Sequence, residues 1–250
     1  MKDWKISSEN TVIDEIINYT AYSIGAFMGD GYSRFNVMPQ GKGSWYTTEV
    51  SCMDLDIIER VQKEFFILSG TKYAITNRIM SSKTILFTIR ASKKIVFDFY
   101  NCITVYKREV PQEIFSLSDK IKRDFLAGIF DTDGTVKKTK TSNSSMVSNN
   151  PRWQLGFSTT IRQVVEEVAS LLRLLDVKPG NISEYTKGPY KTVYALHPNI
   201  RSFIDSGCYF HCKRKSNRIQ DYLNHVVGSE TMYAAPLTKG DDIVQACAKA

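Results

Sequence analysis

Apolar residues recur every three or four positions in two separate segments of the chain, 53–70 and 161–177. This spacing places their side chains on one face of an α-helix, so both segments are predicted to be helices packed on a core. Shorter segments around them alternate polar and apolar residues and end in turn-forming residues, which is typical of strands joined in hairpins. The pattern therefore predicts helices combined with antiparallel strands.

The order of these elements occurs twice along the chain. A helix that ends in SIGAFMGDG (23–31) recurs 103 residues later as LAGIFDTDG (126–134). In each copy two strands follow, and Trp45 and Trp153 open the second of them. A helix, a hairpin and a final helix complete each copy, so the predicted plan is αββαββα, twice.

The two copies are joined by a short linker around residues 113–118. Pro111 is expected to end one helix, and Ser118 or Asp119 is expected to cap the next. The predicted domains are a first half (1–115), a second half (116–227) and a C-terminal tail (228–250) in which the repeat is lost. The predicted fold class is α+β, a pseudo-twofold duplicated αββαββα with two antiparallel sheets, and a hydrophobic content of 42% is sufficient for two cores.

Both repeated helices end in Asp-Gly, at Asp30 and Asp133. The ordinary interpretation of one such motif is a helix end, because Gly and Asp tolerate the turn that follows. Both helices also carry small residues, which would let two helix backbones approach closely. The predicted interface residues are Gly25, Gly29, Gly128 and Thr132. If the helices cross, the two aspartates meet, and adjacent carboxylates need a cation such as Mg²⁺ between them.

LAGIFDTDG resembles the signature of the LAGLIDADG homing endonucleases almost letter for letter, and SIGAFMGDG is similar to it in a degenerate form. The resemblance covers residues 18–226, and it implies that the two sheets form a saddle that binds DNA. It departs from the family pattern at Met28, where the family often has an acid and the second motif has Asp131. The metal-site residues that it implies are Asp30, Asp133, Gly29 and Thr132, and the two aspartates are also the implied catalytic residues.

The resemblance implies a sequence-specific double-strand DNA endonuclease that hydrolyses phosphodiesters with Mg²⁺ and leaves short 3′ overhangs. Mn²⁺ is expected to substitute for Mg²⁺. Because both motifs lie on one chain, the protein is expected to act as a monomer on a long asymmetric site. Family members place a lysine near the metals, and the matching segments here are 105–110 and 209–219. Lys107 and Lys213 are the residues chosen from them, with Arg214 and Lys215 as alternatives to Lys213. An equally good interpretation of these basic clusters is contact with the DNA backbone or with solvent.

Polar residues alternate with apolar ones along two of the predicted strands, which gives each strand one polar face. One face of each sheet is expected to pack on helices and the other to be free. Phe35 and Val37 lie opposite the polar residues of the first strand, and Ile75 and Ile79 lie opposite those of the third, so these apolar residues are expected on the covered face. Polar faces and basic loops of this kind can contact base edges and phosphates. The predicted DNA-binding residues are Tyr32, Arg34, Asn36, Lys42, Lys72, Thr76, Arg78, Lys137, Lys138, Lys140, Arg152 and Lys215.

The charge of the chain suits a polyanionic partner, because the net charge is +7 and the pI is near 9.0. Residues 1–118 carry 14 basic against 13 acidic residues, and 119–250 carry 19 against 13, so the second half is expected to hold DNA more tightly. Five widely spaced cysteines do not form a disulfide pattern, and no apolar run approaches the roughly 18 residues that span a bilayer. An intracellular protein, cytoplasmic in a prokaryote or organellar, is expected.

Two other functions remain open. An intron maturase would use the same basic sheets to bind intron RNA, and relatives of the resembled family act in this way. A DNA-binding protein of the same fold without cleavage is disfavoured because Asp30 and Asp133 are both intact. A zinc site at Cys208, His211 and Cys212 is disfavoured because the paired CxxC spacing is missing, and His197 is interpreted as a turn residue.

Overall fold

The computed structural model describes residues 6–37, 43–139, 152–188 and 191–233. The first half contains α1 (Ile6–Asp30), β1 (Gly31–Val37), β2 (Ser44–Cys52), α2 (Leu55–Ser69), β3 (Ile75–Ile79), β4 (Ile85–Ala91) and α3 (Lys94–Ile103). The second contains α5 (Asp119–Thr132), β5 (Gly134–Thr139), β6 (Arg152–Thr159), α6 (Arg162–Leu174), β7 (Ser183–Lys187), β8 (Lys191–Leu196) and α7 (Ile200–Asp205). The duplicated αββαββα plan is therefore confirmed.

Two helices lie outside the duplicated plan. The short helix α4 (Gln112–Ser116) connects the halves, directly after Pro111 and across the expected boundary at 115/116. The long helix α8 (Lys213–Tyr233) follows α7 and continues through residue 228, where a separate tail was expected. Residues 234–250 lie outside the described part of the chain. Within the described ranges, no helix combines the length and the apolar character that crossing a membrane requires.

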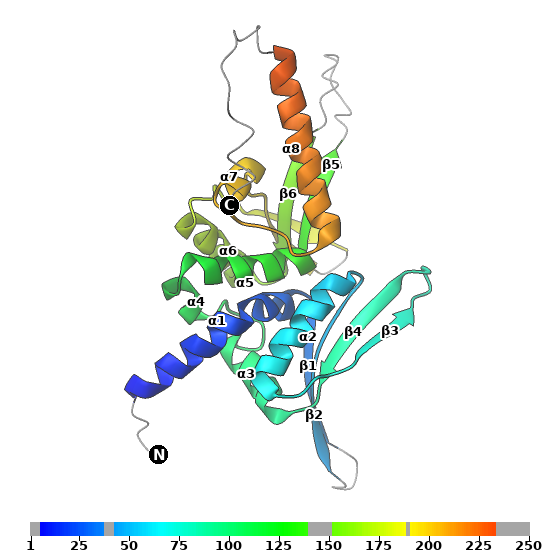
Figure 1. Ribbon diagram of the computed structural model, residues 1–250, viewed down its shortest axis with the longest axis vertical. Helices are drawn as coiled ribbons and strands as arrows, with labels where there is room; N and C mark the ends of the chain where they lie inside the picture. The colour runs from blue at the N-terminus through cyan, green and yellow to red at the C-terminus, as the bar shows by residue number, and fades with distance from the viewer. Residues whose placement is uncertain (1–5, 38–42, 140–151, 189–190, 234–250) are drawn as a thin grey trace.

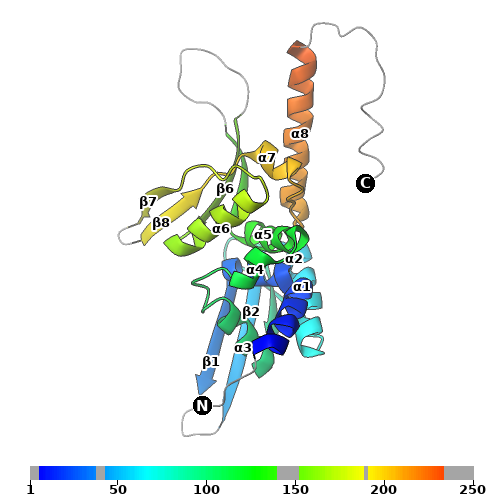
Figure 2. The ribbon, with the colours of Figure 1, turned by 90° about the vertical axis from the view of Figure 1, so that its left-hand side faces the viewer.

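Each half contains one four-stranded antiparallel sheet, with the orders β1-β2-β4-β3 and β5-β6-β8-β7. Figure 2 shows the two sheets in different halves of the molecule, with α1 and α5 between them. Phe35 pairs with Tyr46 in the first sheet, and Lys138 pairs with Trp153 at the same place in the second. Tyr46, and not Trp45, is thus the counterpart of Trp153. A shift of one residue reverses the face of a strand, so the two tryptophans point to opposite faces of their sheets.

The strand β3 begins at Ile75, three residues later than predicted. Tyr73 is buried, and its ring packs edge-on against Phe65 of α2, with 6.3 Å between the ring centroids. Because this contact holds the segment against α2, Lys72 precedes the sheet instead of joining its polar face. At the other end, Ile79 was expected on a covered face but is 76% exposed, since the β3–β4 hairpin projects beyond the helices (Figure 1).

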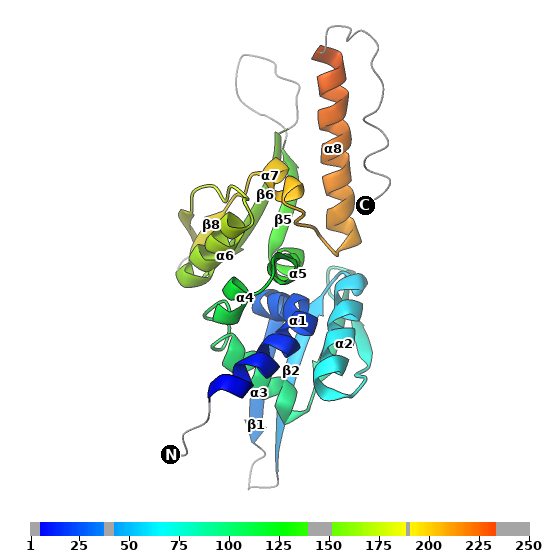
Figure 3. The ribbon, with the colours of Figure 1, turned by 60° about the vertical axis from the view of Figure 1, so that its left-hand side comes forward.

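The halves meet where α1 packs against α5 at the centre of the molecule (Figure 3). A β-carbon added to Gly25 would lie well under 3.0 Å from the carbonyl oxygen of Phe125, and one added to Gly128 would collide equally with a carbonyl of α1. Gly29 lies against the side chain of Thr132. Only residues without a β-carbon let the backbones come this close. The predicted small residues therefore lie in the helix interface.

The same two helices carry the aromatic centres of both halves. Phe27 of α1 packs against Tyr100, with ring centroids 5.1 Å apart, and Phe130 of α5 packs against Phe157 at 5.7 Å. Phe27 and Phe130 occupy the same position of the two motifs, 103 residues apart. All four rings belong to one hydrophobic cluster that runs through both halves. The two halves consequently share a core and are not independent modules.

Replacing Gly25 by Ala tests the close approach of the helices. Alanine normally favours a helix over glycine by about 1 kcal/mol. Here the added methyl group meets the backbone of α5, so we expect the free energy of unfolding to fall by about 1–3 kcal/mol or more. Urea denaturation measures the change. Asn18→Ala, at an exposed position of the same helix, is the control and should stay within about 0.5 kcal/mol of the wild type. A gain in stability at Gly25 would contradict the packing.

Candidate active site and nucleic-acid interface

The two motif aspartates lie at the ends of the crossing helices. Asp30 is the last residue of α1, and Asp133 directly follows the last residue of α5. Because the helices touch where Gly29 meets Thr132, a β-carbon added to Gly29 would lie 3.3 Å from Cγ of Asp133. The carboxyl group of one motif therefore lies against the backbone of the other.

Burial and repulsion both act on this pair of carboxyl groups. Burial, and after it the charge of Asp30, raise the pKa of Asp133 to about 6. Burial likewise raises the pKa of Asp30 above its ordinary value. The ammonium groups of Lys107 and Lys215 lower the pKa of both carboxyl groups, but burial outweighs them. Two ionised carboxylates are thus costly at this place unless a cation lies between them.

Two lysines occupy equivalent places beside the aspartates. Nζ of Lys107 donates hydrogen bonds to the carbonyl oxygens immediately before and after Asp30, at 2.7 and 2.8 Å. Nζ of Lys215 reaches the two carbonyl oxygens that flank Asp133, at 3.5 and 2.7 Å. Burial lowers the pKa of both lysines, and neighbouring carboxylates raise it. Lys215 is therefore the counterpart of Lys107.

This placement corrects two predictions. Lys213, expected to match Lys107, begins α8 with an exposed side chain, and its backbone N–H donates to Oδ2 of Asp56 at 2.7 Å. Two residues along a helix rotate the side chain by about 200°, so Lys213 and Lys215 cannot both point at the second motif. Lys215 was expected to bind DNA from the surface, but it is 3% exposed and lies beneath the surface.

Lys107 is held by an unusual turn after α3. Val105, Tyr106 and Lys107 all have left-handed backbone conformations, with φ of 45°, 55° and 67°. Each such residue costs about 1–2 kcal/mol when it is not glycine. The turn is held by hydrogen bonds from the N–H of Tyr106 to the carbonyl of Asn101 (2.9 Å) and from the N–H of Lys107 to Oγ1 of Thr104 (3.1 Å). Strain of this kind persists where surrounding contacts enforce it, often at functional sites.

The oxygen atoms around the pair suit a hard divalent cation. The pKa shifts of Asp30 and Asp133 arise from burial and charge alone, and no described residue donates a hydrogen bond to either carboxylate. Mg²⁺ is commonly held by one or two carboxylates together with water and substrate phosphates. The carbonyl groups of Gly29 and Thr132 precede the aspartates, and each keeps a lone pair beside its contact with a lysine. In the described part of the chain, no three His, Cys, Asp or Glu side chains gather to hold a metal ion by themselves.

A cavity of about 300 Å³ adjoins one side of the pair. Its lining includes Asp133, Lys107, Met28 and residues 158–161, which form the end of β6 and the connection to α6. The cavity therefore leaves room for small ligands or water next to the carboxylate of the second motif and the lysine of the first. Residues of both halves of the chain line this cavity.

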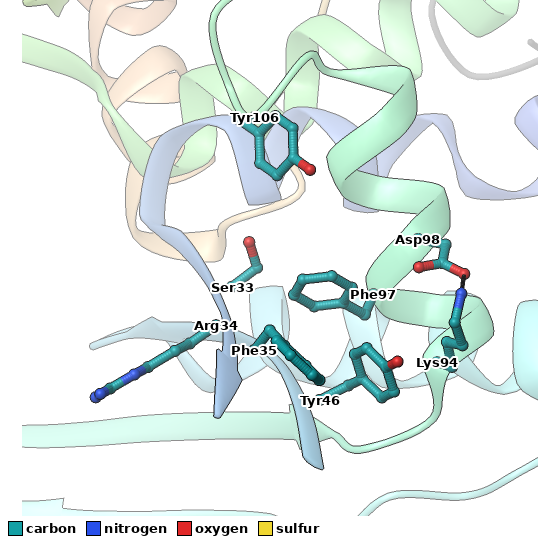
Figure 4. A pocket seen from close by; sticks show the side chains of 8 residues that line it. All are labelled: Ser33, Arg34, Phe35, Tyr46, Lys94, Phe97, Asp98 and Tyr106. Carbon is teal, nitrogen blue, oxygen red and sulfur yellow. Dashed lines mark hydrogen bonds and ion pairs between the residues drawn. The ribbon is translucent and has the colours of Figure 1, made fainter. Parts of the chain in front are cut away.

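Polar residues of β1 project from the face of the sheet that is turned away from α3. Tyr32, Arg34 and Asn36 alternate with Ser33 and Phe35, as predicted for a strand. Figure 4 shows Phe35 turned toward α3, whereas Arg34 points to the opposite side. Tyr32 and Arg34 are exposed, and Asn36 is half-buried. These three residues are thus available to a ligand that lies on the open face of the sheet.

The face turned toward α3 holds an open cleft of about 570 Å³ (Figure 4). Tyr46 lies between Phe35 and Phe97, with ring centroids 5.1 Å apart in both pairs. Phe35 nevertheless remains 46% exposed, and Val37 is exposed beyond it. The apolar side of β1 was expected to be covered, and this expectation is only partly met, because the strand extends past the aromatic residues that α3 supplies.

In the second sheet, Lys137 occupies the position of Arg34 and pairs with Gln154, so it lies on the open face. Lys138 alternates to the other face, where its Nζ lies 5.5 Å from the centroid of the Trp153 ring. Both lysines were predicted to contact DNA from a long polar loop, but they lie in β5 on opposite faces of the sheet, and a contact of Lys138 with DNA stays a prediction. Consecutive residues of a strand cannot share a face.

The other predicted contacts divide into three groups. Thr76 and Arg78 are exposed members of β3 and point to one face of the sheet, while Lys72 precedes the strand. Lys42 and Lys140 lie outside the described residues, as does the side chain of Arg152. The structure accordingly brings Tyr32, Arg34, Asn36, Thr76 and Arg78 together on the first sheet, and Lys137 lies on the second.

Several residues on the open faces were not predicted. Glu49 forms an ion pair with Arg90 at 2.7 Å on the first sheet. The strand registers make Gly156 the counterpart of Glu49, and His197 lies beside Gly156, with its Nδ1 3.0 Å from Nε2 of Gln154. An alignment of the two copies on their Asp-Gly motifs and strand lengths, and not on their tryptophans, would have indicated that Gly156 replaces Glu49. The two open faces therefore carry different chemical groups.

Comparison with sequences of known proteins identifies the second half. Residues 120–223 match the model of a family described as a LAGLIDADG-like domain. An uncharacterized protein of Methanocaldococcus jannaschii is 25% identical over 209 residues, which cover 81% of this chain and 70% of that protein. A DNA polymerase of Acanthamoeba polyphaga mimivirus is 31% identical over 140 residues, 52% of this chain, and the match spans 8% of the polymerase.

Comparison with solved structures extends the likeness to both halves. A variant of the homing endonuclease I-DmoI, in complex with its target DNA and in the presence of Mn, covers 81% of this chain with a TM-score of 0.54 and 15% identity, and the match covers 98% of that protein. The homing endonuclease I-GzeII in complex with its DNA target covers 86% with a TM-score of 0.52 and 13% identity, over 93% of its own chain. Residues 120–223 thus form a LAGLIDADG-like domain, and the chain as a whole has the duplicated fold of the single-chain LAGLIDADG homing endonucleases, as its two Asp-Gly motifs predicted.

Proposed function

We propose that this protein is a sequence-specific endonuclease that hydrolyses both strands of duplex DNA with a divalent cation held between Asp30 and Asp133. The observation that carries this proposal is the pair of carboxyl groups at the helix crossing. Asp133 is half-buried and Asp30 is exposed, and neither carboxyl group accepts a hydrogen bond from the described residues. Lys107 and Lys215 flank the pair from equivalent positions, which suits a reaction performed once on each strand. The likeness to DNA-bound homing endonucleases supports the choice of DNA as substrate.

Each group at the site has a role in phosphodiester hydrolysis. Asp30 and Asp133 would hold the cation, and the carbonyl groups of Gly29 and Thr132 would be further ligands. When bound, Mg²⁺ or Mn²⁺ stabilises negative charge on the phosphate and lowers the pKa of an attacking water. The ammonium groups of Lys107, which is half-buried, and of Lys215, which is buried, would stabilise the negative charge that develops on the scissile phosphates, because solvent screens such charges less than exposed ones. The product is expected to carry short 3′ overhangs.

The open faces of the two sheets form the DNA-binding saddle in this proposal. Arg34 and Lys137 occupy equivalent positions on those faces and contact phosphates of the two half-sites. The faces otherwise differ, because an acid–base pair on the first sheet is replaced by a glycine and a histidine on the second. One chain therefore recognises a long asymmetric site as a monomer. The charge of +6 on residues 119–250 favours tighter binding by the second half.

Asp30→Asn and Asp133→Asn test the metal site. Each change removes a negative oxygen but keeps the size of the side chain, so we expect cleavage to be abolished while DNA binding persists. The measurement uses a randomised duplex library with Mg²⁺ or with EDTA, followed by sequencing of the ends that are produced. Asp14→Asn, an acid on the same helix as Asp30, is the control and should cut like the wild type.

The same library separates the alternatives. Paired cuts at one long motif, made by the wild type only with Mg²⁺, support the endonuclease. If the wild type binds the library and never cuts it, the proposed cleavage is wrong, and intron RNA becomes the next ligand to test. Cleavage that survives in Asp133→Asn, per bound complex, would contradict the assignment of the metal ligands.

Lys215→Met and Lys213→Met distinguish the buried lysine from its exposed neighbour. Loss of the Lys215 ammonium group removes a charge beside Asp133, and we expect single-turnover cleavage to slow by about 100-fold or more, as for other preorganised electrostatic groups. Lys213→Met should retain nearly the wild-type rate. Rates are measured with saturating protein, and the melting temperature of each variant is determined in parallel. Equal losses in both variants would refute the pairing of Lys215 with Lys107.

The pH dependence of cation binding follows from the raised pKa of Asp133. A folded-state pKa of about 6, against an ordinary value of 3.8, means that the protonated carboxyl stabilises the fold at low pH and that this stabilisation is lost as the pH rises toward 6. A bound cation reverses that loss and requires the ionised form. We therefore expect Mn²⁺ to raise the melting temperature more at pH 7 than at pH 5. Asp133→Asn should lack the effect, and a larger shift at pH 5 would contradict it.

A further inference from the structure

Asp131, two residues before Asp133, is a buried carboxylate that the proposed reaction does not use. It is 2% exposed. Its Oδ2 accepts three hydrogen bonds, from the hydroxyl of Tyr22 at 2.8 Å and from the backbone N–H groups of His211 and Cys212, both at 3.0 Å. The last two donors stand immediately before α8. Asp131 thus attaches the start of α8 to the end of α5.

The first turn of α8 connects this attachment to Lys215. The carbonyl oxygen of Cys212 accepts the backbone N–H of Lys215 at 3.1 Å and that of Ser216 at 2.9 Å. The side chain of Lys215 then returns to α5, where Nζ donates to the carbonyl oxygens of Phe130 and of Asp131 itself. The carboxylate and the lysine therefore form a closed loop of contacts between two helices. A shift at Cys212 would displace the ammonium group.

The first half holds its lysine, Lys107, by different contacts. The position of Asp131 is occupied there by Met28, which has no charge and accepts no comparable set of hydrogen bonds. Lys107 instead depends on the left-handed turn 105–107 and on hydrogen bonds within it. The ammonium groups of Lys107 and Lys215 thus lie at equivalent places, but unrelated contacts hold the two side chains there. A substitution at Asp131 can therefore displace the side chain of Lys215 and leave that of Lys107 in place.

We propose that Asp131 is a positioning residue for Lys215 alone, and that it thereby controls the hydrolysis of one DNA strand and not of the other. This inference rests on the proposed endonuclease function for its consequence on strands. The pseudo-twofold axis that exchanges the two motifs also exchanges the strands of a bound duplex, so each lysine serves one strand. Loss of the carboxylate turns an enzyme that cuts both strands into one that preferentially nicks.

The first test measures lysine placement without DNA. The full-length wild type, Asp131→Ala and Asp131→Asn are treated with formaldehyde and a borohydride reductant, and methylation of each lysine is followed by peptide mass spectrometry. We expect Lys215 to react faster in Asp131→Ala, because its carbonyl contacts loosen, while Lys107 keeps its wild-type rate. Asp131→Asn retains an acceptor oxygen and should change in the same direction by less. Tyr22→Phe removes only one of the three hydrogen bonds and should leave both lysines unchanged.

The second test measures the two strands separately on a duplex that the wild type cuts, with a different label on each strand. Misplacement of a catalytic group by about 1 Å costs up to about 100-fold, so we expect Asp131→Ala to slow one strand by about 10- to 100-fold relative to the other. Asp131→Asn should show a smaller bias. Tyr22→Phe should keep the wild-type strand ratio, which separates positioning from a general loss of stability.

The outcomes decide between positioning and structure. A selective change at Lys215 and on one strand supports the proposal. Equal slowing of both strands, or methylation that rises at both lysines or at neither, would overturn it. If Asp131→Ala does not fold, the same criteria of selectivity apply to Asp131→Asn. Failure of the wild type to cut any duplex would refute the proposed function alone, because the methylation test still decides whether Asp131 positions Lys215.

Discussion

The contact between the backbones of α1 and α5 is the interaction on which the rest of the structure depends. Gly25 and Gly128 allow it, since any β-carbon at these positions would meet a carbonyl group of the other helix. The contact brings together two helix C-terminal ends, each carrying an aspartate. A helix C-terminus, burial and a neighbouring carboxylate all disfavour negative charge. The packing of the central helices therefore holds together two carboxyl groups that would otherwise separate, and it raises the pKa of both.

The two lysines show how a duplicated site can stay equivalent in position while its support diverges. Lys107 and Lys215 place their ammonium groups on matching carbonyl oxygens of the two motifs. One lysine follows a strained left-handed turn, and the other lies in the first turn of a long helix that Asp131 anchors. What the two halves share is the location of a positive charge beside a carboxyl group. The backbone that delivers the charge differs.

The surfaces of the halves have also diverged. The strands have equivalent registers, so a given position of one sheet has a definite counterpart on the other. On the open faces, the ion pair of Glu49 and Arg90 corresponds to a bare glycine beside His197. Strands with equivalent registers thus present different hydrogen-bonding groups at corresponding positions of the two sheets. A ligand with two unlike halves suits such a surface better than a symmetric one.

The sequence by itself determined the duplicated order of elements, the pairing of α1 with α5 and the meeting of Asp30 with Asp133. These follow from local periodicity, small residues on a helix face and one internal repeat, all of which are visible in the order of residues along the chain. It did not determine that Lys215 and not Lys213 faces the motif, that Lys138 turns away from Lys137's face toward Trp153, or that Lys72 stays outside β3. The rotation of α8 depends on contacts with Asp131 and Asp56. The face on which a strand residue lies depends on register, and the start of β3 depends on the packing of Tyr73 against α2. The tertiary structure decided these features, because each depends on a contact between two elements of the fold.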